Sequence, residues 1–209
     1  MPEQKTDTSI VHIVDDDESL RRAINSLCRS IGLQTCTYGS AQEFLDAKRQ
    51  DIPGCLVLDV RLPGISGLDF QSQLMQLGIH LPVILITGHG DIHMSVRAMK
   101  AGAVDFLPKP FRDQDLLDAV TAAIERDRRR RMVDAGATLL HDRFLTLSPR
   151  ERQVMMMVTT GRMNKQVAGD LGLSEITVKI HRSAAMRKMG AQTLADLVRM
   201  ADPLRPKSR

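Results

Sequence analysis

The stretch that most constrains the fold is residues 55–60, which read Cys-Leu-Val-Leu-Asp-Val. An apolar run of this length, set off by Pro53-Gly54, is typical of a strand that is buried on both faces. Asp59 lies near the end of the run, and Pro63-Gly64 turns the chain soon afterwards. Because ligands bind outside the carboxyl ends of the strands in an open parallel sheet, Asp59 is a candidate functional carboxylate.

The N-terminal part of the chain alternates strand patterns with helix patterns. This alternation predicts an α/β domain with a parallel sheet covered by helices on both faces. The expected strands are residues 10–14, 33–38, 55–60, 82–87 and 104–107, each followed by apolar residues at helical spacing. Ser40 and Glu43 have the spacing of a capping box, which marks the helix start after the second strand.

The predicted strand ends bring five chemically matched side chains to one edge of the sheet. Asp15 and Asp16 follow the first strand, Asp59 and Thr87 come from the third and fourth, and Lys109 follows the fifth. Three adjacent carboxylates repel one another unless a cation is bound, and hard oxygen ligands favour Mg²⁺. With Lys109 and Thr87 as donors, such a site fits phosphoryl transfer with Asp59 as the nucleophile. The alternative is that the five residues only cap turns and form ion pairs.

Charge divides the chain into two unequal parts. Residues 1–125 contain 11 Lys and Arg against 17 Asp and Glu (net −6), whereas residues 126–209 contain 18 against 8 (net +10). This split predicts that only the C-terminal part meets nucleic acid, although a basic segment can also serve solubility or an acidic partner. The three cysteines lack metal-ligand spacing, and no apolar run reaches membrane-spanning length. We therefore expect a cytoplasmic protein with reduced cysteines and no membrane partner.

Residues 126–143 are expected to form a linker that begins as a helix and loosens near Gly136. The linker contains four consecutive arginines, residues 128–131, and has lost the apolar stripe of the preceding helix. Such a run either contacts DNA phosphates or forms a solvated face, and we favour the solvated face. The expected domains are therefore residues 1–125 and 144–209, on either side of this linker.

The C-terminal part of the sequence predicts a small domain of four helices. The run Ser148-Pro149-Arg150-Glu151 has the order of an N-cap, a first helical proline and a capping-box glutamate. Asn164 and Ser174 are the expected N-caps of two further helices, which a turn at Gly172 separates. Two helices joined by a Gly-containing turn, the second rich in basic residues, predict a helix-turn-helix whose second helix enters the DNA major groove. A generic helical bundle with charged faces is the alternative. The run Met155-Met156-Met157 is interpreted as core filler.

The motifs of the first domain resemble those of the receiver domain of two-component response regulators. The blocks VDDD, LVLDVRLPGISG, ILITGHGD and DFLPKPF occur in the order and at the spacing of that family. The resemblance implies a flavodoxin-like, doubly wound five-stranded sheet of order 2-1-3-4-5 and a cis bond between Lys109 and Pro110. It also implies that a cognate sensor histidine kinase phosphorylates Asp59.

The same resemblance implies roles for residues around Asp59. The implied Mg²⁺ ligands are Asp15, Asp16, Asp59 and the backbone carbonyl of Arg61, and the implied switch residues are Thr87, Lys109 and Phe106. Arg61 and His89 lie two residues beyond Asp59 and Thr87, where we expect them to limit water access to the acyl phosphate and to prolong the phosphorylated state. A zinc site at His89 and His93 is not expected, because no third ligand is evident.

The second domain resembles the LuxR-type output domain of the NarL/FixJ class. The matching blocks are LSPRERQV and NKQVAGDLGLSEITVKIHRSAAMRKMG. By position, base edges would be met by Thr177, Lys179, Ile180 and Ser183, and phosphates by Asn164, Lys165, Arg182 and Lys188. Ser183 is a short neutral side chain where some relatives have a longer polar or basic one. The resemblance implies a transcription regulator that dimerises on phosphorylation and binds double-stranded promoter DNA, with RNA polymerase as a further partner.

Two other classes of protein compete with the response-regulator interpretation. A phosphotransferase or phosphatase with an Asp nucleophile is one, but enzymes of the haloacid dehalogenase type carry a second Asp where this chain has Arg61. A DNA-binding protein with a receiver that serves only as a dimerisation scaffold is the other, and the intact set of five strand-end residues argues against it. We therefore expect no enzymatic activity beyond Mg²⁺-dependent self-phosphorylation and autodephosphorylation.

Overall fold

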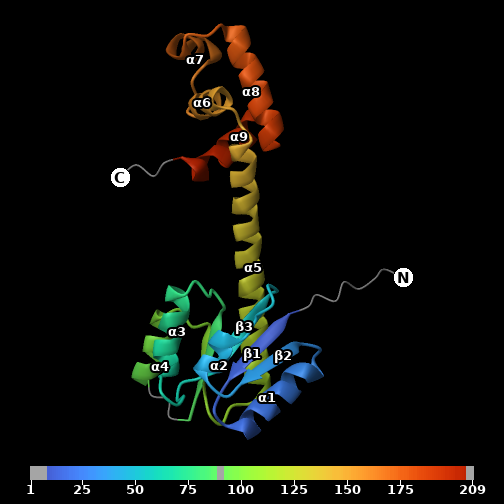
Figure 1. Ribbon diagram of the computed structural model, residues 1–209, viewed down its shortest axis with the longest axis vertical. Helices are drawn as coiled ribbons and strands as arrows, with labels where there is room; N and C mark the ends of the chain where they lie inside the picture. Colours follow the sequence, from blue (N-terminus) through green and yellow to red (C-terminus); the bar gives the residue numbers. More distant parts are fainter. Residues whose placement is uncertain (1–8, 89–91, 206–209) are drawn as a thin grey trace, which may run out of the picture. The chain divides into compact units, whose positions relative to one another are not determined.

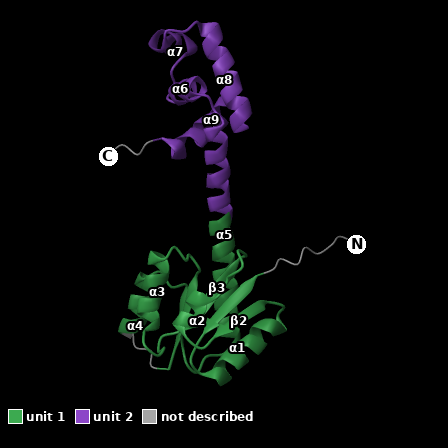
Figure 2. Ribbon diagram, in the orientation of Figure 1, with its two compact units in different colours: residues 1–131 green, residues 132–209 purple. Residues whose placement is uncertain are grey.

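The computed structural model describes residues 9–88 and 92–205, which divide into two compact units, residues 1–131 and 132–209 (Figure 2). The first unit is an α/β domain, and the secondary structure of the second, as far as its residues are described, is helical (Figure 1). Among the described residues, none of the helices combines the length and the apolar character needed to cross a bilayer.

The described part of the first unit contains a five-stranded parallel sheet of order β2-β1-β3-β4-β5, which confirms the predicted order. The strands are β1 (Ile10–Val14), β2 (Gln34–Tyr38), β3 (Gly54–Asp59), β4 (Val83–Thr87) and β5 (Asp105–Pro108). The helices are α1 (Glu18–Ser30), α2 (Ala41–Asp46), α3 (Gly67–Gln76), α4 (Ile92–Lys100) and α5 (Asp113–Leu145). The predicted cis bond between Lys109 and Pro110 is present, and Ser40 caps α2 by accepting from the N–H of Glu43. The predicted capping box is present only in part, because the Glu43 side chain accepts from the N–H of Gly39 rather than from that of Ser40.

Strand β3 is buried on both faces, as its apolar run predicted. Cys55 and Val57 join a cluster with side chains of α1 and α5, whereas Leu56 and Leu58 join a second cluster with side chains of α2, α3 and α4. Alternate residues of a strand point to opposite faces of the sheet, so each face needs its own helical layer. The two helical layers hold β3 in the middle of the sheet and fix the position of Asp59 at its carboxyl end.

Helix α5 differs from the prediction in its length. It runs from Asp113 to Leu145 without a break, so the loosening predicted near Gly136 is wrong. An added Cβ at Gly136 would meet no described atom within 4 Å, so this glycine is an exposed helical position rather than a close packing point. Its cost to the helix, roughly 0.5–1 kcal/mol relative to Ala, is small enough for the surrounding helix formers to overcome.

The four-arginine run also differs from the prediction, because three of its members bind groups of the first unit. Arg130 and Arg131 form ion pairs of 2.7 Å with Asp127, a fully buried carboxylate of α5. Arg128 donates a hydrogen bond of 2.8 Å to the Ser9 hydroxyl. The run is therefore not a solvated linker face at these three positions, because their guanidinium groups form hydrogen bonds and ion pairs within the first unit.

The boundary between the two units lies after residue 131 rather than after residue 125, and this changes the net charge of each part. Residues 1–131 contain 16 Lys and Arg against 18 Asp and Glu, a net charge of −2, and residues 132–209 contain 13 against 7, a net charge of +6. The second unit is still the basic one, although less strongly than a boundary at residue 125 indicates.

The second unit is built from the C-terminal turns of α5 together with α6 (Pro149–Val158), α7 (Asn164–Leu171), α8 (Glu175–Met189), α9 (Leu194–Ala201) and a short 3₁₀ helix η1 (Asp202–Leu204). The capping box at Ser148 and Glu151 is present, and Ser174 caps α8. Met155 is fully buried in the core and Met157 packs against it, which confirms the interpretation as core filler for these two methionines, whereas Met156 is half-buried and outside this core cluster. The prediction that Asn164 is an N-cap is wrong: Met163 holds that position, and its N–H donates to the Gln166 side chain at 2.9 Å.

Candidate functional site

Three carboxylates meet at the carboxyl ends of β1 and β3. Asp15 follows β1 and is fully buried, Asp59 ends β3 and is nearly so, and Asp16 is exposed. One carboxylate oxygen from each of the three lies within 4.8 Å of the others. The apolar residues of both strands bury the backbone up to these positions, so the carboxylates are held at the edge of the sheet by the packing of the strands beneath them.

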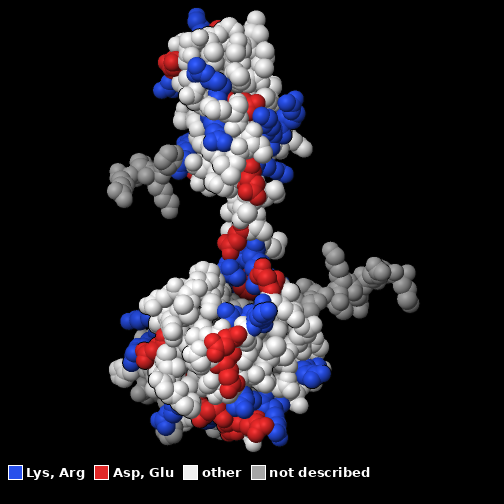
Figure 3. All heavy atoms as spheres, viewed as in Figure 1, with Lys and Arg blue, Asp and Glu red and all other residues white. Residues whose placement is uncertain are grey.

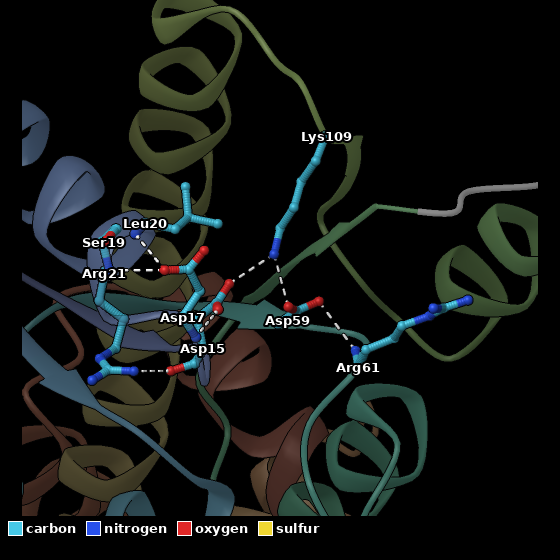
Figure 4. Close-up of polar contacts among 8 residues, drawn as sticks. All are labelled: Asp15, Asp17, Ser19, Leu20, Arg21, Asp59, Arg61 and Lys109. Atoms are coloured by element: carbon cyan, nitrogen blue, oxygen red, sulfur yellow. Dashed lines mark hydrogen bonds and ion pairs between the residues drawn. The ribbon is translucent and has the colours of Figure 1, made fainter.

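Lys109 neutralises part of this negative charge. Its Nζ donates hydrogen bonds of 2.8 Å to Asp15 Oδ2 and 2.7 Å to Asp59 Oδ2 (Figure 4). Burial alone would lower the pKa of Lys109, but the two hydrogen bonds together with the negative charges of Asp15 and Asp59 outweigh burial and keep the pKa above its ordinary value. The lysine is therefore a fixed cation between the two buried carboxylates.

Backbone N–H groups orient the other carboxylate oxygens. The N–H of Asp17 donates to Asp15 Oδ1 at 2.8 Å, and the N–H of Arg61 donates to Asp59 Oδ1 at 3.1 Å. Burial raises the pKa of Asp15, the nearby charge of Asp59 adds to this effect, and the hydrogen bonds from Lys109 and Asp17 oppose it only in part. A cation at this site would remove the repulsion that contributes to the raised pKa of Asp15.

The turn after Asp59 depends on Gly67, a residue that the sequence analysis did not single out. A Cβ on Gly67 would lie 2.3 Å from the backbone oxygen of Asp59, closer than side-chain atoms can approach. The N–H of Gly67 donates to the carbonyl of Val60 at 2.8 Å, which folds the start of α3 back against the end of β3. The signal in the sequence was Ser66-Gly67, an N-cap followed by a residue without a side chain.

The donor set fits a magnesium ion. Carboxylate oxygens are hard ligands, and a site open to solvent on the side of Asp16 leaves room for the waters that Mg²⁺ retains. Asp15, Asp16 and Asp59 would hold the ion. Arg61 is exposed, and its guanidinium group points away from Asp59 in Figure 4.

The structure also places the predicted switch residues. Thr87 is buried at the end of β4, in register with Pro108 of β5. Phe106 is half-buried in β5 and packs against the core cluster that contains Leu58 and Leu85. His89 lies outside the described residues, so its predicted role and the i, i+4 pair with the exposed His93 have no structural description.

In the second unit, helix α8 has one buried face and one exposed face. Val178, Ala185 and Met189 point into the core. Lys179, Ile180 and Ser183, which the resemblance assigns to base edges, are exposed, as is Lys165 of α7. The Lys and Arg side chains over this unit outnumber the acidic ones on the face shown in Figure 3. The first three residues thus share the helix face opposite to the core, where a large ligand can reach them.

Several other residues assigned to DNA contacts have partners within the second unit. Lys188 Nζ lies 2.7 Å from Glu151 Oε2, and this ammonium holds the pKa of Glu151 below its ordinary value. The hydroxyl of Thr177 lies 2.8 Å from that of Ser174 at the start of α8. Asn164 is half-buried and its Oδ1 lacks a hydrogen-bond partner in the described structure, and Arg182 is half-buried. Lys188 and Thr177 are therefore parts of the domain's own framework.

Fold and site together define a class of protein. A buried aspartate that ends the central strand of a 2-1-3-4-5 sheet and joins two further aspartates and a lysine is the arrangement of a receiver domain, and here the same chain carries a helix-turn-helix. These features define a response regulator with a DNA-binding output domain. Comparison with known families agrees: residues 11–121 match the response regulator receiver domain, and residues 145–201 match the bacterial regulatory proteins of the luxR family.

The chain is also similar to named response regulators along most of its length. It is 60% identical to nodulation protein W of Bradyrhizobium diazoefficiens over 94% of this chain and 86% of that protein. It is 47% identical to the response regulator protein TodT of Pseudomonas putida, over 94% of this chain and 87% of that protein. Among solved structures, the response regulator StyR matches with a TM-score of 0.85 and 44% identity, over 94% of this chain and 99% of that one. The chain therefore belongs to the response regulators with a LuxR-type output domain. A receiver joined to a DNA-binding domain implies a sensor kinase as partner and DNA as ligand.

Proposed function

We propose that Asp59 accepts a phosphoryl group from a sensor histidine kinase, and that phosphorylation makes the protein dimerise and bind promoter DNA to regulate transcription. The observation that carries this proposal is the pair of hydrogen bonds from Lys109 Nζ to Asp15 and Asp59. They place a cation beside the one carboxylate that ends the central strand, where a phosphoryl group would bring further negative charge.

The chemical step is a substitution at phosphorus. A carboxylate oxygen of Asp59 attacks the phosphorus of the phosphohistidine, the P–N bond breaks, and the imidazole leaves with the bonding electrons and takes up a proton. The N–H of Arg61 holds Asp59 Oδ1, so the carboxylate keeps its orientation during the attack. Lys109 offsets the charge that develops on the phosphoryl oxygens. Magnesium, when bound by Asp15, Asp16 and Asp59, supplies further neutralisation of the same oxygens.

The phosphorylated state would act on the rest of the receiver through Thr87 and Phe106. The phosphoryl group adds about −1.5 to −2 charges and strong acceptor oxygens, to which the Thr87 hydroxyl can donate. Movement of Thr87 toward the phosphoryl group would leave space in β4 and β5 that Phe106, now half-buried, can fill. A two-state change of this kind supplies a coupling of about 1–3 kcal/mol, or roughly 5- to 150-fold in affinity.

On DNA, a dimer would place two α8 helices in successive faces of the major groove, on a pair of half-sites. The net charge of +6 on residues 132–209 supports binding that weakens steeply with salt, because phosphate contacts release counterions. RNA polymerase is the proposed partner of the DNA-bound dimer.

We further propose that the protein is not an enzyme beyond self-phosphorylation and autodephosphorylation. The exposed, cationic Arg61 two residues beyond Asp59, together with His89, would obstruct the water that hydrolyses the acyl phosphate. The phosphorylated state is then long-lived, and Arg61→Ala and His89→Ala would speed its decay. An unchanged decay rate in both variants would refute this role.

The assignment of Asp59 is tested by incubating the protein with a small radiolabelled phosphodonor and Mg²⁺. The wild type should gain one acid-stable, base-labile phosphoryl group, and Asp59→Asn should gain none. Asp69→Asn is a matched control, since Asp69 is an exposed carboxylate of α3 outside the acidic cluster, and it should be labelled like the wild type. Labelling of Asp59→Asn at the wild-type rate would refute the assignment.

A further inference from the structure

Two isoleucines of α8 are exposed and take no part in the hydrophobic core of the second unit. Ile176 is 71% exposed and Ile180 is 62% exposed. They are four residues apart, so they lie one above the other on the same helix face. Among the residues of α8, the core is served by Val178, Ala185 and Met189 instead. Single exposed apolar residues are common, but two adjacent large ones on one helix face form a small apolar surface.

The geometry of α8 places this apolar surface at the centre of the outward face. At 3.6 residues per turn, Ile176 and Ile180 point away from the side on which Val178 and Ala185 are buried. Ser183 and Arg187 continue the same ridge along the helix, and Lys179 flanks it, all three being exposed. The apolar pair occupies the N-terminal half of the ridge, the half that a recognition helix directs at base edges.

We infer that Ile176 and Ile180 read thymine in the major groove by contact with its C5-methyl group. This inference rests on the proposed DNA-binding function. It adds Ile176 to the residues that contact bases, and it adds apolar contact with a methyl group to the ways in which α8 recognises DNA. Among the groups that base pairs present in the major groove, the thymine methyl is the apolar one, and the others are hydrogen-bond donors and acceptors. An isoleucine side chain makes no hydrogen bond, so its favourable contact in the groove is with this methyl group.

The charges around the pair select DNA over a second copy of this chain. A symmetric contact through this face would bring the cations Lys179 and Arg187 of both copies together, and α8 offers only Glu175 as an acidic residue to offset them, so the net interaction is repulsive. Facing DNA, the same side chains meet phosphates. The ridge therefore combines cations that can bind the DNA phosphates with apolar groups that can contact one kind of base, and a surface that recognises a DNA sequence needs both.

The inference is tested with DNA that lacks only the methyl groups. A duplex bound by the full-length phosphorylated protein is selected from a random-sequence pool, and the same duplex is synthesised with deoxyuridine in place of thymidine. Deoxyuridine keeps every hydrogen-bonding group of thymidine. Each contacted methyl should contribute about fourfold in affinity, equivalent to ~0.8 kcal/mol per buried carbon, so two contacts predict a loss of about 15-fold.

Variants separate this contact from general binding. The double variant Ile176→Ala/Ile180→Ala keeps a good helix former at both positions, so α8 should stay folded. It should bind the thymidine duplex about as weakly as the wild type binds the deoxyuridine duplex, with the ratio between the two duplexes reduced to about one. Lys179→Ala should weaken binding to both duplexes and keep the wild-type ratio. Leu145→Ala, at an exposed apolar residue outside α8, should keep both the affinity and the ratio.

The possible failures are distinguishable. Specific binding with equal affinity for the two duplexes would overturn the methyl contact and leave the proposed function standing. A double variant that retains the wild-type ratio would overturn the assignment to these two isoleucines. If the phosphorylated protein selects no sequence from the pool, both the proposed function and this inference are overturned. A weaker self-association of the double variant in the absence of DNA, with an unchanged ratio, would show instead that the face binds a second copy.

Discussion

Removing the carboxylate of Asp127 should destabilise the receiver far more than removing a neighbouring surface carboxylate. Asp127 is fully buried, and it accepts a hydrogen bond of 3.1 Å from the N–H of Gly54, the first residue of β3. It also pairs with Arg130 and Arg131, and Arg131 pairs in turn with Asp51. This group ties the last receiver turn of α5 to the start of the strand that ends in Asp59.

The magnitude follows from what Asp127→Ala leaves behind. Removing one partner of a buried ion pair costs about 3–5 kcal/mol, and a buried N–H left without an acceptor costs about 1–3 kcal/mol. The side chains of Arg130 and Arg131 are 35% and 26% exposed, so water can rehydrate both guanidinium groups once the carboxylate is gone. Partial rehydration places the expected loss near the lower end, at about 3 kcal/mol.

Urea unfolding followed by tyrosine fluorescence measures this loss. Tyr38 is the sole tyrosine and the chain has no tryptophan, so the signal reports the receiver. Glu125→Gln is the matched control, because Glu125 lies on the same helix and its ion pairs with Arg128 and Arg129 are half-exposed. It should cost less than ~1 kcal/mol. Equal losses in the two variants, or a loss below ~1 kcal/mol for Asp127→Ala, would refute the role of the buried carboxylate.

Three further predictions use the same chain. Burial, with a smaller contribution from the charge of Arg49, lowers the pKa of His12 from 6.5 to about 4, so the folded receiver binds fewer protons than the unfolded chain. The free energy of unfolding of the receiver should therefore fall by about 2 kcal/mol between pH 7 and pH 5. Urea unfolding at the two pH values should show a smaller decrease for His12→Gln than for the wild type. Gly136→Ala should raise helix content and stabilise α5 by roughly 0.5–1 kcal/mol, whereas a loosened linker would show no change in circular dichroism. Lys165→Ala should lower the salt dependence of DNA binding by about one ion. Lys188→Ala breaks the ion pair with Glu151, so it should lower the melting temperature and leave the salt dependence of DNA binding unchanged. The reverse pattern in the two variants would contradict these assignments.

The strands and the meeting of their carboxyl ends could be predicted from the sequence because they depend on patterns within single elements, whereas the sheet order was implied only by the family resemblance. The apolar run before Asp59 predicts a strand buried on both faces, and parallel strands bring their carboxyl ends to one edge. The capping residues Ser148 and Glu151 act across one helical turn, so their spacing is visible in the sequence.

The parts that sequence patterns missed depend on contacts between distant residues. Four arginines in a row are usually solvated, and nothing in the local pattern indicates that Asp127, which directly precedes them, is buried against Gly54, 73 positions away. A glycine at position 136 predicts a weak helix, but the helix runs through it without a break. Asn164 is a favoured capping residue, yet the chain starts α7 one residue earlier and the Gln166 side chain caps it.

The central claim is that phosphorylation of Asp59 controls DNA binding through dimerisation. It is tested most directly by titrating a selected duplex at one fixed salt concentration with phosphorylated protein, unphosphorylated protein and Asp59→Asn, with sedimentation of each sample in parallel. The phosphorylated wild type should sediment as a dimer and bind roughly 5- to 150-fold more tightly than the other two, which should remain monomers. Equal affinities and an unchanged monomer mass in all three samples would contradict this mechanism of control.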